Sequence, residues 1–227
     1  MIQNNRRASA SICVPKNQSM RITKVKKGKK RYNIYINNEF SLAVGEETLL
    51  KMDIYEGKGV EEGELEKIRE FEENVRAKDY ALNLLSYRPR TRRELLRRLK
   101  KKKFAPDVAE ESVSRLERSG LVNDYDFTIY FLETFKDRRG IYRLKNDLFR
   151  LGVDGDTIDR ALADVSIDER ETARKLIDRW LRTHRTRDEK TRRRLVNYLA
   201  QRGISWSTIS DLHDYIKTRA ADNRSTN

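Results

Sequence analysis

The chain contains three copies of one pattern of apolar residues. In each copy, five positions follow one another at spacings of 4, 5, 5 and 4 residues, and successive copies begin 49 and 51 residues apart. The positions are Leu95, Leu99, Phe104, Ala109 and Val113; Leu144, Leu148, Val153, Ile158 and Leu162; and Leu195, Leu199, Ile204, Ile209 and His213. A period of this length is typical of helical units that stack on their neighbours rather than of one closed core. Such proteins commonly present an extended binding surface, so a catalytic pocket is the less natural expectation.

The composition agrees with small helical units and points to an anionic partner. Hydrophobic residues make up 37% of the chain and charged residues 38%, a mixture that suits amphipathic helices packed side by side. The 50 Lys and Arg outnumber the 36 Asp and Glu, which leaves a net charge of +14. We therefore expect a polyanionic partner, either nucleic acid or an acidic protein face. The alternative is that the charge only keeps the chain soluble, but its clustering favours a partner.

Several classes of protein are excluded by what the sequence lacks. One cysteine, Cys13, cannot form an intrachain disulfide, and with two histidines it cannot build a zinc cluster. We therefore expect a reducing, cytoplasmic compartment and no metal or other cofactor. No apolar run reaches the roughly 20 residues of a membrane span. Neither a glycine-rich phosphate loop nor a recognisable nucleophile and base is present, so we do not expect an enzyme.

The N-terminal part of the chain predicts a small β module. Residues 1–19 are expected to be a disordered leader, and the module is expected to span residues 20–62. Alternating apolar residues predict three strands, and a short helix is expected to close the module. The strands are expected at 21–25, 32–36 and 40–44, and the helix at 46–52. Gly57, Gly59 and Gly63 are interpreted as part of an acidic linker.

The remainder of the chain predicts three units of three helices each. The units are expected at residues 63–122, 123–166 and 167–219, followed by a disordered tail at 220–227. In the first unit the helices are expected at 64–87, 92–101 and 106–119. The fold class is therefore mainly α, with three three-helix units in an elongated, curved array behind a small three-strand module. Short loops between the helices leave no room for an active-site lid.

Local signals predict where some helices begin and which aromatic residues are buried. Two capping boxes, 91–94 and 186–189, each place a threonine hydroxyl against a backbone N–H and a glutamate that reaches back to the cap residue. The helical spacing of three aromatic residues favours core packing over base stacking. These residues are Phe127, Phe131 and Phe135. Trp180 and Trp206 are interpreted as packing anchors. His213 occupies an apolar repeat position and is expected in the core or at its edge.

Basic residues are concentrated around the second helix of each unit. Residues 88–103 contain ten cationic residues and one acid, Glu94. On a helical wheel the leucines of 92–101 form one stripe and the cations face the other way. Arg92 and Arg93 lie at the positive end of the helix dipole, so the dipole does not account for them, and a ligand-facing role is favoured. The predicted filament- or DNA-binding residues are Arg88, Arg90, Arg92, Arg93, Arg97, Arg98, Lys100, Lys101, Lys102, Lys103, Arg138, Arg139, Arg143, Lys145, Arg192, Arg193 and Arg194.

An ordered series of short motifs begins at residues 81–95, which read ALNLLSYRPRTRREL. The series continues through GLVND at 120–124, RG at 139–140 and GV at 152–153. As an ordered set it resembles the RecX family, regulators of the RecA recombinase, whose opening motif is A-x-x-x-L-x-x-R-x-R-S-x-x-E-L. Thr91 replaces the usual serine and Asn123 the usual aspartate, and both changes keep the capping chemistry. The resemblance covers roughly residues 20–217.

This resemblance implies a function in DNA repair, recombination and the SOS response. RecX-like proteins fold as tandem three-helix units that lie in the groove of the RecA–single-stranded DNA filament. They restrain its ATP hydrolysis, strand exchange and co-protease activity, and some members also bind DNA directly. We therefore expect a monomeric regulator, in the direction of inhibition, that binds the RecA filament through a basic concave surface. The alternative is a free-standing, helix-turn-helix-like DNA-binding protein.

Overall fold

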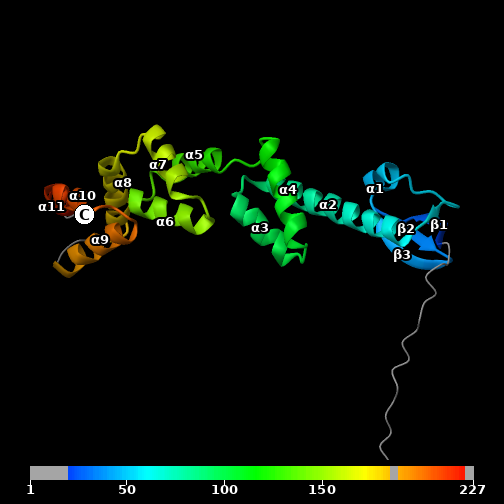
Figure 1. Ribbon diagram of the computed structural model, residues 1–227. Coiled ribbons are helices and arrows are strands. Elements are labelled where there is room, and N and C mark those ends of the chain that lie inside the picture. Colours follow the sequence, from blue (N-terminus) through cyan, green and yellow to red (C-terminus); the bar gives the residue numbers. More distant parts are fainter. Residues whose placement is uncertain (1–19, 185–188, 223–227) are drawn as a thin grey trace, which may run out of the picture. The chain divides into compact units, whose positions relative to one another are not determined.

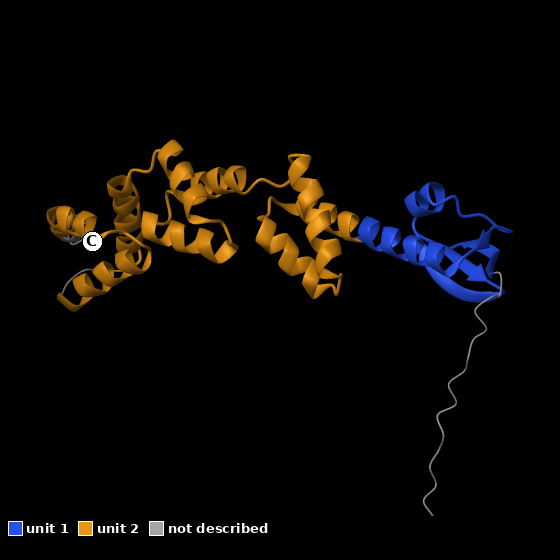
Figure 2. Cartoon of the chain, in the orientation of Figure 1, with its two compact units in different colours: residues 1–76 blue, residues 77–227 orange. Residues whose placement is uncertain are grey.

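The structure, a computed structural model, describes residues 20–184 and 189–222. Two compact units divide the chain, residues 1–76 and residues 77–227 (Figure 2). Three segments lie outside the described residues: the predicted leader, residues 185–188 and the end of the predicted tail, 223–227. The second segment includes most of the second predicted capping box, 186–189.

Unit 1 contains a small antiparallel sheet with the strand order β3-β2-β1-β4 (Figure 1). The three predicted strands and the short helix are confirmed. Their bounds are β1 (Met20–Lys27), β2 (Tyr32–Ile36), β3 (Glu39–Val44) and α1 (Glu46–Lys51). The fourth strand, β4 (Gly59–Val60), lies in the segment interpreted as a linker and pairs with the start of β1. A strand of two residues is too short to show an alternating pattern in the sequence.

One face of the sheet supplies the core of unit 1. Ile22, Ile34 and Val44 are buried against Leu65 and Ile68 of helix α2 (Glu62–Tyr87). Burial of these five aliphatic side chains contributes roughly 1.5–3 kcal/mol for each of them and so stabilises the packing of the small sheet against the helix. The opposite face of the sheet is not part of this core.

Unit 2 is helical and has three separate cores. It holds the end of α2 and nine helices of the described chain, namely α3 (Arg92–Lys101), α4 (Pro106–Arg118), α5 (Asp124–Phe135), α6 (Ile141–Leu151), α7 (Gly155–Asp164), α8 (Glu169–Leu181), α9 (Glu189–Gln201), α10 (Trp206–Asp211) and α11 (His213–Asp222). The buried residues form one cluster within 77–122, one within 127–165 and one within 173–216. The mainly helical class with three-helix domains is therefore confirmed.

The apolar repeat identifies most of these buried residues. Twelve of its fifteen positions are buried, and Phe104 and Leu162 are partly buried. The remaining position is an error of the prediction, because His213 is exposed and Leu212 is buried in its place. The expected last helix ends at Asp211 and a second helix starts at His213. The buried residues Ile209, Leu212 and Ile216 are spaced 3 and 4 residues apart, so Leu212 rather than His213 lies on the buried side.

The two tryptophans have different environments. Trp180 is 7% exposed and belongs to the third core, as expected. Trp206 is 68% exposed, so its interpretation as a packing anchor is wrong. Ser205 caps α10 by accepting the backbone N–H of Thr208, which leaves Trp206 as the first residue of that helix, with its side chain in solvent.

Neighbouring repeats of unit 2 meet through one recurring contact. The glycine that follows the second helix of one repeat packs against the start of the second helix of the preceding repeat. A methyl group at Gly152, after α6, would overlap the side chain of Arg93 in α3. A methyl group at Gly203, after α9, would overlap the backbone of Arg143 in α6. Both glycines have positive φ, +94° and +82°, which independently favours glycine.

Polar contacts hold the same two junctions. The Thr91 hydroxyl donates to the carbonyl oxygen of Leu151 at 2.6 Å. The backbone N–H of Gly140 donates to the carbonyl oxygen of Arg202 at 2.9 Å. The C-terminal end of α6 is therefore held at the first turn of α3, and that of α9 at the first turn of α6. This arrangement places the second helices of the three repeats end to end within unit 2.

Candidate functional site

Helix α3 has an apolar face and a cationic face, as the helical wheel predicts. Leu95 and Leu99 are completely buried in the first core. The exposed cations of this helix follow one another around its opposite side and continue into the next turn. They are Arg93, Arg97, Lys100, Lys101, Lys102 and Lys103. We call these six residues the α3 ridge.

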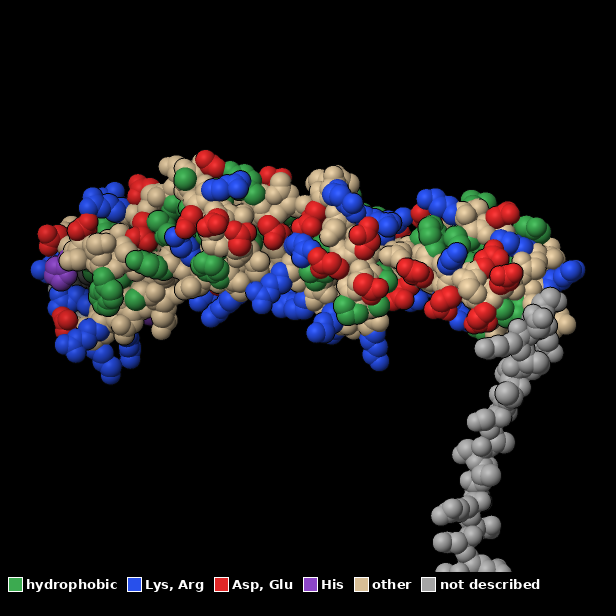
Figure 3. Space-filling view, in the orientation of Figure 1, with side chains coloured by type: hydrophobic (Ala, Val, Ile, Leu, Met, Phe, Trp, Pro, Cys, Tyr) green, Lys and Arg blue, Asp and Glu red, His purple; other side chains and the backbone are tan. Residues whose placement is uncertain are grey.

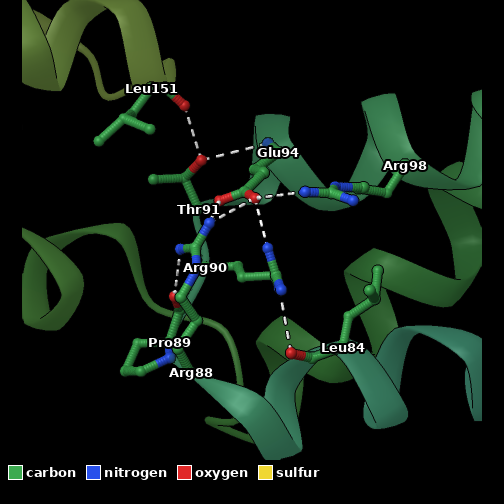
Figure 4. Close-up of polar contacts among 8 residues, drawn as sticks. All are labelled: Leu84, Arg88, Pro89, Arg90, Thr91, Glu94, Arg98 and Leu151. Carbon is green, nitrogen blue, oxygen red and sulfur yellow. Dashed lines mark hydrogen bonds and ion pairs between the residues drawn. The ribbon is translucent and has the colours of Figure 1, made fainter.

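A buried carboxylate holds three other predicted arginines (Figure 4). The Glu94 side chain is only 2% exposed and accepts hydrogen bonds from Arg88, at 2.7 and 3.0 Å, and from Arg90. Arg98 lies 3.8 Å from the same carboxylate. The Arg90 guanidinium also donates to the carbonyl oxygen of Leu84 at 3.0 Å. The residue is 8% exposed, so Arg90 is an interior residue and not part of a binding surface.

The first capping box is only half formed in the expected way. Thr91 accepts the backbone N–H of Glu94 at 3.1 Å, which is the predicted cap. The Glu94 carboxylate binds the arginines instead of reaching back to the cap residue. The capping-box pattern does not predict this, because it takes no account of the nearby arginines, which compete for the carboxylate. The cluster fixes the start of α3 and so orients the α3 ridge.

Arg92 is compensated by acidic side chains. It forms ion pairs with Glu110 and, at 3.1 Å, with Glu117, both on α4. The hydrogen bond with Glu110 raises the pKa of Arg92 above its ordinary value. Its backbone N–H donates to the Asp124 carboxylate at 2.8 Å. The position of Arg92 at the positive end of the helix is therefore explained by packing partners, without a ligand.

The basic residues of the second repeat are mostly paired. Arg139 and Arg143 share the Asp147 carboxylate at 2.8 and 3.1 Å, and Lys145 lies 2.7 Å from Asp159. The Arg139 guanidinium also lies over the ring of Phe135, 4.1 Å from its centroid. In the part of the chain that the structure describes, Arg138 is exposed with no acidic side chain within ion-pair distance.

The third repeat resembles the second in this respect. Arg192 and Arg193 both pair with Glu189 at the start of α9. Arg194 is exposed and forms no ion pair with another described residue. The seventeen predicted residues are therefore not equivalent. Among these seventeen, exposed cations without an acidic partner in the described residues are concentrated on the α3 ridge, with single contributions from Arg138 and Arg194.

The charged side chains of unit 2 are unevenly distributed over the face shown in Figure 3. Lys and Arg gather along the edge that carries α3, α6 and α9, while Asp and Glu are frequent over the rest of this face. The junctions hold these three helices end to end, and in this view their cations gather along the same edge of unit 2 (Figure 3). A surface of this kind attracts polyanions over about one Debye length, roughly 8 Å in physiological salt.

Sequence reasoning missed the aromatic residues on the exposed face of α6. Tyr142 is 64% exposed and Phe149 is 49% exposed, and Asn146 and Arg150 lie between and beside them on the helix. These four positions correspond to Arg93, Arg97, Lys100 and Lys101 after the repeat offset of 49 residues. Aligning the repeats by their exposed positions, rather than by their apolar ones, would have found them.

Asp124 offers a test of how the first two repeats are joined. Burial raises the pKa of this carboxyl group above its usual range, while the Arg92 N–H acts in the opposite direction. When the pKa of a carboxyl group is higher in the folded state than in the unfolded state, ionisation of the group destabilises the folded state. The unfolding free energy then falls as the pH rises through the range between the two pKa values. We expect Asp124→Asn, which keeps the acceptor oxygen, to raise the unfolding free energy at pH 7. The gain should disappear below about pH 4, where the wild-type carboxyl is also protonated.

The measurement is urea unfolding at both pH values. Asp156→Asn is the matched control, because Asp156 is an exposed residue in the first turn of α7. The control separates loss of helix-terminal charge from relief of burial. A less stable Asp124→Asn protein at pH 7 would contradict the inference.

The described residues contain no group of three or more His, Cys, Asp and Glu placed to hold a metal ion. Over the same part of the chain, no helix combines the length and the apolar character needed to cross a membrane. The fold of unit 2 defines a protein built from tandem three-helix repeats, with exposed cations gathered on its second helices.

Comparison with known proteins identifies the family. Models of the RecX N-terminal domain, of the first RecX three-helix domain and of the third match residues 20–61, 77–116 and 168–212. The regulatory protein RecX of Bacillus subtilis is 31% identical over 205 residues, which cover 86% of this chain and 77% of the relative. That of Streptomyces coelicolor is 40% identical over 133 residues, 57% of this chain and 71% of the relative. The chain belongs to the RecX family.

Solved structures support the fold. A crystal structure of regulatory protein RecX aligns with a TM-score of 0.65 at 25% identity and covers 86% of this chain and 99% of its own. RecX from Lactobacillus salivarius aligns with a TM-score of 0.53 at 21% identity, over 66% of this chain and 97% of its own. The relatives carry the name of regulatory proteins, which agrees with the expectation of a regulator rather than an enzyme.

Proposed function

We propose that this protein restrains the RecA recombinase by binding the RecA–single-stranded DNA filament through the cationic side of unit 2. The observation that carries the proposal is the α3 ridge, six exposed cations without acidic partners among the described residues. Membership of the RecX family identifies RecA as the partner in this proposal, because RecX-like proteins are regulators of RecA. The cytoplasm, where RecA filaments form, is the compartment that this function requires.

The arrangement of the repeats supports a polymeric partner. Each junction uses the same contact, a glycine after one second helix against the first turn of the previous one. Corresponding helix faces therefore recur along unit 2 at the spacing of the repeats, although their side chains differ. A filament of identical subunits also presents equivalent sites at a regular spacing. The acidic phosphates and side chains of such a filament complement the cations of α3, and the attraction weakens with salt.

The variant that tests the proposal is Arg97→Glu/Lys101→Glu. These two cations lie one helical turn apart on the exposed side of α3. Arg98 is left intact because it faces Glu94, and Arg93 is left intact because its stem packs at Gly152. We expect the protein concentration needed to slow RecA ATP turnover and strand exchange on single-stranded DNA to rise about tenfold or more, since two attractive contacts become repulsive.

Two controls make this result specific. Arg160→Glu makes the same kind of charge reversal on the exposed side of α7, and we expect it to keep activity. Circular dichroism should show that all variants keep their helix content. RecA rates that wild-type protein in excess leaves unchanged would refute the proposed function. Equal activity of wild type and the double variant would remove the α3 ridge from it.

A further inference from the structure

The outer face of the sheet in unit 1 carries a row of three side chains from three neighbouring strands. Ile34 of β2 is buried, so the next residue, Tyr35, projects from the opposite face. Tyr35 pairs with Lys24 of β1 on one side and with Phe40 of β3 on the other. The rings of Tyr35 and Phe40 meet edge to face, with centroids 6.0 Å apart and an interplanar angle of 77°.

Two irregularities in strand pairing create this row. The register of β1 shifts between Ile22 and Lys24, and without the shift Lys24 would oppose the buried Ile34. The pairing of β3 with β2 shifts between Ile34 and Tyr35, and without this shift Phe40 would oppose Ile36. Each bulge therefore turns one side chain out of the core and places it beside Tyr35. Bulges that redirect side chains are frequent near functional sites.

The surroundings of the row are strongly cationic. Residues 20–36 contain seven Lys or Arg and no Asp or Glu. Five of the lysines are exposed, and none forms an ion pair with another described residue: Lys24, Lys26, Lys27, Lys29 and Lys30. Lys26 shares the outer face with Lys24, and the last three lie at or beside the turn between β1 and β2. A carboxylate does lie beside β1, that of Glu56, and it accepts the backbone N–H of Val25 at 2.8 Å.

We propose that this outer face binds a single strand of nucleic acid, independently of the α3 ridge. Proteins that hold single strands combine exposed aromatic rings, on which bases stack, with cations that contact the phosphates. Phe40 is 59% exposed and supplies the ring, supported by Tyr35, and Lys24 and Lys26 lie on the same face of the sheet. An acidic peptide would use the lysines but leave the exposed ring unoccupied. A duplex would hide its base faces from Phe40.

The experiment measures binding of a fluorescein-labelled oligothymidylate to the full chain by fluorescence anisotropy. All proteins carry Arg97→Glu/Lys101→Glu, so that the α3 ridge contributes little. We expect Phe40→Ala to weaken binding roughly tenfold, about 1.4 kcal/mol. Lys24→Glu/Lys26→Glu should flatten the salt dependence of log affinity by about 0.7 for each phosphate that the protein no longer neutralises.

Two control substitutions lie in the same unit but away from this face. Leu50→Ala removes a side chain that is 72% exposed on α1, and Lys67→Glu reverses an exposed charge on α2. Both should bind the oligonucleotide as the parent does. An unchanged affinity of Phe40→Ala would overturn the proposal, and so would equal binding of a matched duplex. The readout requires no RecA, so failure here leaves the proposed regulation of RecA standing.

Discussion

Glu94→Gln is expected to destabilise the first repeat by about 3–5 kcal/mol. The substitution keeps the size of the side chain but removes the negative charge that faces Arg88, Arg90 and Arg98. Arg90 is 8% exposed and would remain buried without a counter-ion, which is the costly way to break a buried pair. Urea unfolding monitored by circular dichroism measures the loss directly.

Glu110→Gln is the matched control for this prediction. Glu110 also pairs with an arginine, Arg92, but its side chain is 52% exposed. An exposed pair contributes about 1 kcal/mol or less, so the control should change stability little. Similar stabilities for Glu94→Gln and Glu110→Gln would show that the buried cluster does not hold the first repeat together.

Gly140→Ala is expected to disrupt the junction between the second and third repeats. A methyl group at this position would overlap the carbonyl group of Gly203, and backbone atoms cannot turn aside as a flexible side chain can. The φ of Gly140, −73°, suits alanine, so any loss arises from the contact and not from backbone strain. We expect a loss of about 1–3 kcal/mol, as for other overpacked sites.

Hydrogen exchange shows where the loss occurs. Protection should fall at the end of α9 and the start of α6, while the core of the first repeat is unaffected. Gly155→Ala is the control, because a methyl group there would make only ordinary contact, 3.8 Å from the Phe149 ring. Unchanged protection in the Gly140→Ala protein would mean that the two helix ends are not held by this contact.

The helices could be predicted because their signals are local. Asn123, Asp154 and Ser205 each accept a backbone N–H at the start of a helix, as their residue types predict. Gly152 ends α6 with a positive φ, and glycine is the residue type that the sequence predicts for such a helix end. The repeat spacing then indicates which side of each helix is buried, and that requires no knowledge of tertiary contacts.

The candidate site was less predictable because it depends on side-chain pairing that the local helix signals do not describe. Glu94 has the position of a capping-box glutamate, and only the folded chain shows that its carboxylate collects arginines. Arg92 is paired with acids of α4, 18 and 25 residues away. Counting cations along the sequence therefore overestimates the free positive charge. The exposed Trp206 was also missed, because its apolar character does not reveal that it is the first residue of α10, with its side chain in solvent.

The three separate cores of unit 2 have a consequence for how such a chain can change in length. Each cluster of buried residues lies within its own repeat, and adjacent repeats are joined by the glycine contacts and by a few hydrogen bonds, such as those of Thr91 and Gly140. A chain that ended before residue 168 would lack the whole third core and keep the other two cores intact. Modular construction of this kind allows shorter and longer homologues to arise by loss or gain of a terminal module, without redesign of what remains.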